Sequence, residues 1–441
     1  MHVPRRGRFA RFRRLARPWR SRRRSVVVFG AAGSLALACL LIYVVTGCQT
    51  TPRDAGPTTP VEGISSEPTV RVRIVTAGPT VALAAAGPML VSPSAQAQQF
   101  GPRCGVRREG DAFILTPTGA AGVRWRVPKL FVQPTAGQTI NVNGGTYPGT
   151  ITLHARSNDR VDAINEVSIE QYIPGVISKE LYASWHASTF EAQAIAARTY
   201  AIAQLRRTRS RHYDLESTEA SQVYGGTTGN RTALDAVQKT RGVVLTWERR
   251  IFPAYYSSCT GPLGQDAAAA FPDGEDIPPL RAREHGGWDA AASTYRWGPV
   301  VRDRRTLSKR LAAWGKAHNH KVAALGPLRI IEPASTNRVG RPTAFALADE
   351  AGKRFVLPCE TFRHACNFGA SDLPELSSAG KLKSSHVEVT ITGEQVRITG
   401  RGHGHGVGMS QWGAQAMALK GYNAASILAF YYPGATLVRA Y

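Results

Sequence analysis

The sequence predicts an α+β protein, with a β-rich part over residues 69–165 and a mixed helix and strand part over residues 166–441. Two observations predict this class. Short runs that alternate apolar and polar residues fill the first part, and Gly and Pro separate them at roughly 8- to 12-residue intervals, which is typical of small antiparallel sheets. The hydrophobic period then changes at Glu170 to one that favours helices.

Composition narrows the class of protein further. The chain has 441 residues, a formal net charge of +24, 43% hydrophobic residues and 20% charged residues. These values exclude a disordered polyelectrolyte, a multi-span membrane protein, a collagen and a disulfide-dense miniprotein. The positive charge suits a polyanionic neighbourhood such as cell-wall polymer, lipid head groups or lipopolysaccharide.

The amino terminus has the pattern of a bacterial export signal. Residues 1–24 are rich in arginine, and residues 25–47 are uncharged and mostly apolar. Thr46 and Gly47 directly before Cys48 are similar to a lipobox, which predicts that Cys48 is lipidated. The alternatives are an uncleaved signal anchor, since about 20 apolar residues span a bilayer, and a twin-arginine signal. Each places the bulk of the chain outside the cytoplasm. The lipobox and the signal anchor predict an exported, membrane-anchored protein of the cell envelope, and a nucleic-acid partner is not expected.

Residues 48–68 then form a predicted tether, because Thr, Pro, Gly and Ser dominate and no apolar periodicity is present. Beyond it, four cysteines remain in a chain expected to work outside the cytoplasm. One or two disulfides are therefore the default expectation, with three possible connectivities that the sequence leaves open. These residues are Cys104, Cys259, Cys359 and Cys366.

Alternating runs at residues 70–75, 112–115 and 151–153 are the clearest strands of the β-rich part. In the second part, Ser188 and Glu191 form a capping box that predicts the start of a helix. An apolar stripe follows, and its small side chains predict close packing against another backbone. The stripe consists of Phe190, Ala194, Ala197, Ala201 and Leu205. Arg198 on this helix is expected to anchor a nearby carbonyl or carboxylate.

Later segments carry weaker patterns. Residues 243–258 favour strands, residues 303–317 favour a helix, and residues 267–279 favour a loop. Near the carboxyl terminus, glycines alternate with other residues over 400–408. An extended chain would place these glycines on one face, where another backbone can approach closely, and would place His403 and His405 together on the other.

Ser410 is expected to cap a helix that runs to about Lys420, with Gly421 in the stop position. Common catalytic signatures are absent from the sequence. No Gly-Lys pair precedes Ser or Thr, no His-Glu-x-x-His occurs, and Ser410 lacks a glycine two residues on. Nucleotide hydrolases, zincins and α/β-hydrolases are therefore excluded.

Glu180 is the candidate acid. It lies in an apolar stretch over residues 173–181, five residues before Trp185. A carboxyl group in apolar surroundings has a raised pKa and can donate a proton near neutral pH, which is what glycosidic cleavage needs. The alternative is an ordinary surface glutamate paired with Lys179 or solvent. Trp185, like Trp412, Tyr224 and Tyr431, could stack on sugar rings or could belong to the core.

Five segments of the chain resemble the SpoIID/LytB family of stage II sporulation protein D and amidase enhancers. They occur in the family's order and cover roughly residues 70–441, most densely 160–260 and 395–437. The matching segments are 165–181, 192–200, 222–226, 404–414 and 427–434. Departures from the family pattern are found at Leu181, Ser188, Glu191, Cys259 and His403.

The resemblance implies a peptidoglycan lytic transglycosylase without a cofactor, whose catalytic region is residues 166–441. It would cut the β-1,4 bond between N-acetylmuramic acid and N-acetylglucosamine in peptide-free glycan strands, leaving 1,6-anhydro ends. Glu180 falls on the family's catalytic glutamate. The resemblance also implies substrate contacts for His405, Ser410, Gln411, Gln222, Tyr224, Trp185 and Ser258.

Two other functions remain open. The chain could be a wall-binding enhancer that recruits or activates an N-acetylmuramoyl-L-alanine amidase, as the amidase-enhancer branch of the family implies. A weaker alternative is a zinc protein that uses His403, His405 and Cys259. No metal is expected for the transglycosylase, and whether such an enzyme serves sporulation or general wall turnover stays open.

Overall fold

The computed structural model describes residues 64–93, 97–135 and 139–441. The predicted export signal, Cys48 and most of the tether lie outside these residues. In the part of the chain that is described, no helix is long and apolar enough to cross a membrane.

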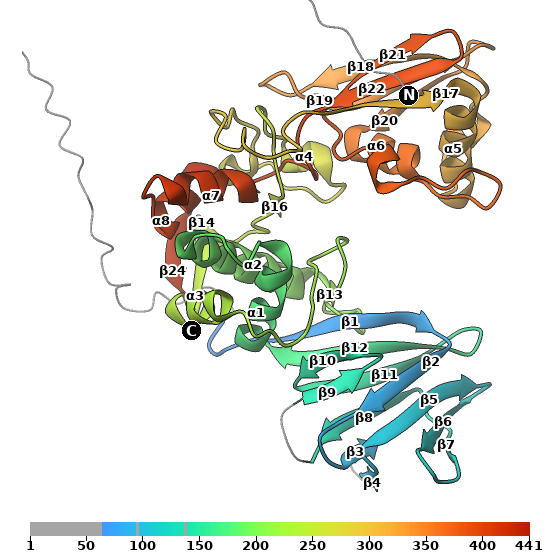
Figure 1. The fold of residues 1–441 in the computed structure, drawn as a ribbon, viewed down its shortest axis with the longest axis vertical. Coiled ribbons are helices and arrows are strands. Elements are labelled where there is room, and N and C mark those ends of the chain that lie inside the picture. Colours follow the sequence, from blue (N-terminus) through green and yellow to red (C-terminus); the bar gives the residue numbers. More distant parts are fainter. Residues whose placement is uncertain (1–63, 94–96, 136–138) are drawn as a thin grey trace, which may run out of the picture. The chain divides into compact units, whose positions relative to one another are not determined.

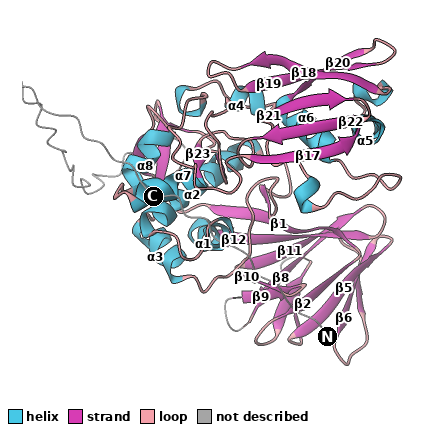
Figure 2. Ribbon diagram, turned by 45° about the horizontal axis from the view of Figure 1, so that its top comes forward, coloured by secondary structure: helices cyan, strands magenta, loops and turns pink. Residues whose placement is uncertain are grey.

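The predicted α+β class is confirmed, and nearly all regular structure before residue 169 is strand (Figure 2). A seven-stranded sheet has the order β13-β1-β12-β11-β8-β3-β4, and a six-stranded sheet has the order β10-β9-β2-β5-β6-β7. Val81, Phe113 and Leu153 are among the buried side chains of their shared core. The strands are β1 (Thr69–Gly78), β2 (Thr80–Ala84), β3 (Met89–Ser92), β4 (Gln98–Phe100), β5 (Arg103–Glu109), β6 (Ala112–Pro117), β7 (Val123–Trp125), β8 (Lys129–Pro134), β9 (Thr139–Val142), β10 (Gly145–Pro148), β11 (Thr150–Arg156), β12 (Arg160–Ser168) and β13 (Leu215–Glu216).

Helices begin where the hydrophobic period changes (Figure 1). The central helix α2 contacts four other helices and β14, and every residue from 192 to 203 is buried. Its alanines allow this crowding, so the predicted close packing is confirmed. The elements of this second core are α1 (Ile169–Glu180), α2 (Ala187–Arg207), α3 (Arg231–Lys239), β14 (Val243–Trp247), β15 (Arg250–Ile251), β16 (Tyr256–Ser257), β23 (Met409–Ser410), α7 (Gln411–Leu419), α8 (Ala424–Tyr431) and β24 (Thr436–Arg439).

Residues 297–400 form a third region with a hydrophobic core of its own. Two three-stranded sheets, β17-β22-β21 and β18-β19-β20, make up its strands. The predicted helix at 303–317 is confirmed, and Asp303 caps it by accepting from the N–H of Thr306. The elements are β17 (Trp297–Asp303), α5 (Arg304–Ala317), β18 (Leu328–Thr336), β19 (Pro342–Asp349), β20 (Arg354–Pro358), α6 (Cys359–Asn367), β21 (Val387–Thr392) and β22 (Gln395–Gly400).

Short helical turns complete the described elements. The predicted loop at 267–279 contains α4 (Ala267–Ala270) and the first two residues of a 3₁₀ turn, so that prediction was wrong at both ends of the segment. The others are single 3₁₀ turns at η1 (Pro278–Leu280), η2 (Lys321–Ala324) and η3 (Ser378–Gly380).

The predicted capping box of α2 is wrong. His186 is the N-cap, and its side chain accepts from the N–H of Ser188, which already lies inside the helix. Glu191 instead forms an ion pair with Lys239 of α3 at 2.6 Å. The helix therefore starts two residues before the sequence pattern indicated, because a histidine ring nitrogen takes the capping role.

The expectation of a disulfide is also wrong for the described cysteines. Cys104, Cys259, Cys359 and Cys366 are all free and buried. Cys359 and Cys366 are seven residues apart on α6, about 10 Å at the α-helical rise, whereas bridged Cα atoms lie within about 7 Å. Cys104 lies in the core of the β-rich part.

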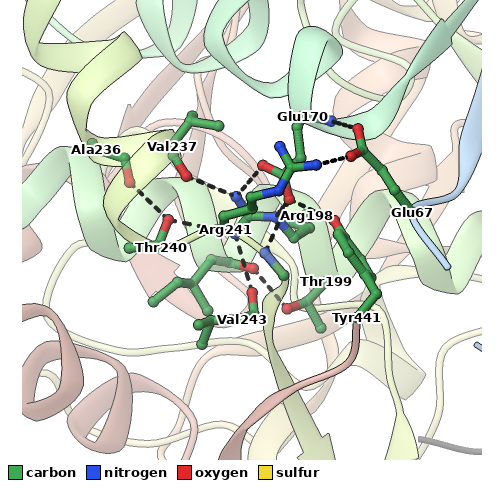
Figure 3. Close-up of polar contacts among 12 residues, drawn as sticks. Glu67, Glu170, Arg198, Thr199, Ala236, Val237, Thr240, Arg241, Val243 and Tyr441 are labelled. Atoms are coloured by element: carbon green, nitrogen blue, oxygen red, sulfur yellow. Dashed lines mark hydrogen bonds and ion pairs between the residues drawn. The ribbon is translucent and has the colours of Figure 1, made fainter. Parts of the chain in front are cut away.

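The anchoring role predicted for Arg198 is confirmed (Figure 3). Its guanidinium is fully buried and binds both carboxylate oxygens of Glu170, at 2.9 and 2.7 Å. It also donates to the carbonyl of Val243 at 3.1 Å. Glu170 accepts further hydrogen bonds from the Tyr441 hydroxyl and the Gly242 N–H. The ion pair thus joins α1, α2, β14 and the carboxyl-terminal residue.

Candidate active site

Glu180 is the last residue of α1, and its side chain is partly buried. One carboxylate oxygen, Oε2, accepts from the Nε2 of Gln411 at 3.0 Å, and Oε1 accepts from the N–H of Val223 at 3.3 Å. Burial raises the pKa of this carboxyl, and the two hydrogen bonds only partly oppose that effect. Among the described residues, Glu180 forms no salt bridge, so the alternative of a pair with Lys179 was wrong.

The segment that binds Oε1 is packed tightly against α1. Gly175 of α1 faces the carbonyl of Gly226, where a Cβ atom would come within 2.0 Å of the oxygen. The N–H of Gly225 donates to the carbonyl of Gly175 at 3.2 Å. This close approach is possible only because Gly175 has no side chain, and it holds Val223 beside the carboxylate.

Gln222 and Tyr224 flank Val223 and point into the protein. Gln222 is 1% exposed; its Oε1 accepts from the Tyr172 hydroxyl, and its Nε2 donates to the Tyr256 hydroxyl. Tyr224 is 4% exposed and donates to the Oδ1 of Asn165 at 3.0 Å. Both side chains are therefore buried beside Val223, where their hydrogen bonds hold this segment in place.

Ser410 caps α7 as predicted, since its Oγ accepts from the N–H of Gly413 at 3.3 Å. The same hydroxyl donates to the Oδ2 of Asp289 at 2.9 Å, and Ser410 is fully buried. The next residue, Gln411, is therefore held at the first turn of α7 with its amide on Glu180. Gly421 follows α7 with φ +89°, which confirms the predicted helix stop.

The alternating glycines before α7 are not extended, so that prediction was wrong. Gly402, Gly404, Gly406 and Gly408 all have positive φ, a left-handed conformation open to glycine. The predicted close approach of another backbone is confirmed, since a Cβ on Gly408 would lie 2.1 Å from the carbonyl oxygen of Tyr255. Residues 402–408 therefore form a succession of turns with left-handed glycines, and not a strand.

His403 and His405 are not paired on one face. His403 exchanges two main-chain hydrogen bonds with Cys259 and has an exposed side chain. His405 packs its ring on Tyr255 and Phe271, and burial lowers its pKa to about 4. Within the described ranges, no group of three or more His, Cys, Asp or Glu side chains could hold a metal ion, so the zinc alternative has no ligand set there.

An aromatic cluster stands beside the acid. Trp185 and Trp412 have ring centroids 5.1 Å apart, and Tyr182 lies 5.4 and 6.0 Å from them. Tyr182 is 62% exposed, the largest aromatic exposure found among the described large hydrophobics. The N–H of Trp412 donates to the Ser258 carbonyl at 3.1 Å. Sequence reasoning missed Tyr182, although its place two residues after Glu180 was a usable signal.

Comparison with known proteins supports the predicted resemblance. Residues 157–247 match the family model described as stage II sporulation protein, SpoIID. This segment of the chain is therefore similar to a SpoIID domain. This domain contains α1, α2, Glu180 and the Val223 segment, whereas Gln411 and Trp412 reach the site from outside the matched residues.

Three relatives match 60–67% of the chain at 25–30% identity. The amidase enhancer of Bacillus subtilis (strain 168) is 30% identical over 292 residues, which are 60% of this chain but 40% of the enhancer. Stage II sporulation protein D of the same organism is 25% identical over 311 residues, 66% of this chain and 80% of that protein. An uncharacterized protein of Brachyspira hyodysenteriae is 27% identical over 300 residues, 67% of this chain and 73% of that protein.

In and around the matched segment, the predicted site residues occupy four kinds of position. Glu180, Gln411, Trp185 and the Ser258 carbonyl lie at or beside the acid and its aromatic cluster. Gln222, Tyr224 and Ser410 are buried beneath it. His405 lines a small cavity with Tyr200, Tyr255, Tyr256 and Phe271. Tyr431 is 1% exposed and belongs to the core.

Proposed function

We propose that the protein is a peptidoglycan lytic transglycosylase and that Glu180 is its acid and base. The observation that carries the proposal is the environment of this carboxyl group. It is partly buried, its pKa is raised, and it is held by a neutral amide and a main-chain N–H in place of a cation. A carboxyl in that state keeps its proton nearer to neutral pH and can donate it.

The reaction needs one carboxyl group. Glu180 donates its proton to the glycosidic oxygen as the bond from that oxygen to C1 of N-acetylmuramic acid breaks. The carboxylate then takes the proton of the C6 hydroxyl while O6 bonds to C1, so no water is consumed and Glu180 regains its proton. Gln411 and the Val223 N–H donate to the carboxylate that exists between the two transfers. Hydrolases that use a pair of carboxyl groups differ in this respect.

The aromatic cluster supports a sugar substrate. Tyr182, Trp185 and Trp412 offer ring faces and edges on the exposed side of the acid. Such rings combine a large apolar surface with a polar edge, which suits the mixed character of a sugar ring. We expect the glycan to lie across this cluster, and we place the protein in the cell envelope, anchored through its amino terminus.

A second candidate function has its own support. The 30% identity to the amidase enhancer favours a protein that binds wall glycan and stimulates an N-acetylmuramoyl-L-alanine amidase without cutting glycan itself. This alternative keeps the aromatic cluster as a binding surface but gives no role to the proton on Glu180.

The test compares full-length protein in mild detergent with its Glu180→Gln and Glu332→Gln variants on purified peptide-free glycan strands. Glu332 is an exposed carboxylate on β18 and serves as the matched control. The proposal predicts 1,6-anhydro ends, identified by mass spectrometry, from wild type and Glu332→Gln but not from Glu180→Gln.

Two results would contradict the proposal. Reducing ends in the products would mean hydrolysis. Glycan binding without cleavage by any of the three proteins, together with stimulation of an added amidase by all three, would favour the enhancer function.

A further inference from the structure

A cavity of about 290 Å³ lies at the start of the third region, between β17, β21 and β22. Its lining includes Arg296, Trp297, His386, Glu388 and Arg401. Two of these side chains are guanidinium groups, and one is a carboxylate. The cavity is thus a concave site with positive charge on its walls, apart from the Glu180 site.

Neither guanidinium is satisfied by a buried partner. Arg296 is exposed and makes no hydrogen bond or ion pair with any residue in the described part of the chain. Arg401 binds Glu388 at 3.0 Å, but the Glu388 side chain is 72% exposed. An exposed ion pair of this kind is worth little, so an incoming anion can take the place of Glu388 on Arg401.

His386 adds a second, independent observation. It is 7% exposed, yet its imidazole makes no hydrogen bond within the described residues, and its Nδ1 is buried without a partner. Burial and the nearby charges of Arg341 and Arg401 lower its pKa to about 3, so the ring is neutral. Because Nδ1 is sealed from solvent, a ligand in the cavity would reach this ring through Nε2, which makes no hydrogen bond within the described residues.

The cavity is connected to the aromatic cluster through main-chain contacts. Arg401 is two residues from His403, which exchanges two hydrogen bonds with Cys259. The adjacent Ser258 carbonyl accepts from the N–H of Trp412. Main-chain contacts therefore connect the lining of the cavity, at Arg401, to the segment that holds Trp412.

Guanidinium groups bind carboxylates in a planar, two-pronged geometry. In a peptide-free glycan strand, the anionic group is the lactyl carboxylate of each N-acetylmuramic acid. When a stem peptide is attached, that carboxylate is an amide and carries no charge. A site that needs the free carboxylate would therefore distinguish bare strands from peptide-bearing ones.

We propose that Arg296, Arg401 and His386 form a subsite for the free lactyl carboxylate of a glycan strand held at Glu180. The inference rests on the proposed function, because that function supplies the polymer. These three residues lie outside the matched SpoIID residues. They would favour strands whose lactyl carboxylate is free and charged over strands in which it is an amide.

The experiment measures glycan binding in the full-length Glu180→Gln background, so that cleavage does not interfere. Titrations use peptide-free oligosaccharides, the same oligosaccharides with their carboxylates amidated, and poly(glycerol phosphate), at about 0.15 M salt to screen non-specific attraction. Arg296→Ala and Arg401→Ala test the cavity. Arg354→Ala, which removes an exposed arginine of β20, is the matched control.

We expect amidation to weaken binding by about 10- to 100-fold, the range of one charge-assisted contact. Arg296→Ala and Arg401→Ala should lose this difference, whereas Arg354→Ala should keep it. Glu388→Gln, which removes the competing carboxylate, should tighten binding of the free acid.

Equal affinity for the free and amidated strands would overturn the inference. So would tighter binding of poly(glycerol phosphate) that depends on Arg296 and Arg401, because the ligand would then be a phosphate polymer. These outcomes are separate from the cleavage test. If wild type fails to cut glycan, the binding difference still decides whether the subsite exists.

Discussion

The helix α1 carries a glutamate near each end, and the two carboxyl groups are in opposite states. Glu170, in the first turn, binds the buried guanidinium of Arg198, and that ion pair holds its pKa below the usual value despite burial. Glu180, at the last residue, has an amide and a main-chain N–H as partners, and burial raises its pKa. One helix thus holds a structural carboxylate and a candidate acid.

The comparison shows that the charge of the partner decides the state of a buried carboxyl group. The helix dipole acts in the same direction, since its amino-terminal end favours a negative charge and its carboxyl-terminal end disfavours one. The surroundings of the two carboxyl groups differ in the same way. Glu170 is 8% exposed, and its carboxylate binds Arg198, Gly242 and Tyr441. Glu180, by contrast, adjoins an exposed tyrosine, Tyr182.

The largest expected effect separates activity from stability at Glu180. Glu180→Gln should lower glycan cleavage by about 10³-fold or more, because general acid and base catalysis are both lost. Its free energy of unfolding should stay within about 1 kcal/mol of wild type. Cleavage rates and chemical denaturation, measured on the same preparations, test both parts. Retained cleavage would remove Glu180 from the mechanism.

Substitution of Arg198 should instead lower the stability of the fold. Arg198→Met leaves Glu170 buried without its cation, and we expect a loss of about 3–5 kcal/mol in the free energy of unfolding. Adding Glu170→Met should recover most of that loss, because no unpaired charge then remains. Denaturation midpoints measure both variants, with Arg354→Met as a surface control. A loss below about 1 kcal/mol for Arg198→Met would mean that the pair is not an anchor.

Removing a ring of the aromatic cluster should have a smaller effect, and it should change the affinity for glycan without a direct effect on the chemical step. Tyr182→Ala should weaken the affinity of the Glu180→Gln variant for peptide-free glycan by about 2- to 10-fold, the range of one aromatic contact. Leu419, on α7 and 68% exposed, provides the matched control in Leu419→Ala. If both substitutions weaken binding equally, exposed apolar area, and not the cluster, is responsible.

The pH dependence of stability should have opposite signs at the two glutamates. The lowered pKa of Glu170 stabilises the fold above the ordinary value of 4.5, and this contribution is lost as pH falls through the folded-state pKa. The raised pKa of Glu180 costs nothing below 4.5, and the cost develops as pH rises through the folded-state pKa.

Unfolding free energies of wild type, Glu170→Gln and Glu180→Gln between about pH 3 and pH 7 check these signs. The deficit of Glu170→Gln should shrink toward low pH. The stability of Glu180→Gln relative to wild type should improve toward neutral pH. Parallel curves for the three proteins would show that the two carboxyls do not differ.

Much of the fold could be predicted from local patterns. The alternating runs indicated β1, β6 and β11, and the alanines of α2 indicated its crowded packing. Capping was less predictable, because Ser188 and His186 both offer an acceptor near the same helix start and only tertiary packing selects one. The glycine alternation was ambiguous for a similar reason, since glycine adopts an extended and a left-handed backbone with little difference in cost.

The candidate site was predicted in part. Glu180 was found through its apolar surroundings and the family resemblance, and Arg198 through its place on a buried helix. The contact between Glu180 and Gln411 joins residues 231 positions apart, and no local pattern reports such a contact. The free cysteines could not be predicted for the same reason. The predicted export would allow disulfides, but only the distances between cysteines decide whether they form.

The central claim is that Glu180 is the single acid and base. The most direct test is to incubate peptide-free glycan with full-length protein in ¹⁸O-labelled water and to determine the masses of the new ends by mass spectrometry. If Glu180 takes the C6 proton while O6 closes on C1, the products are anhydro ends that contain no solvent oxygen. New ends that carry one ¹⁸O atom each would show that water attacks C1, and they would contradict the account of Glu180 as the single acid and base.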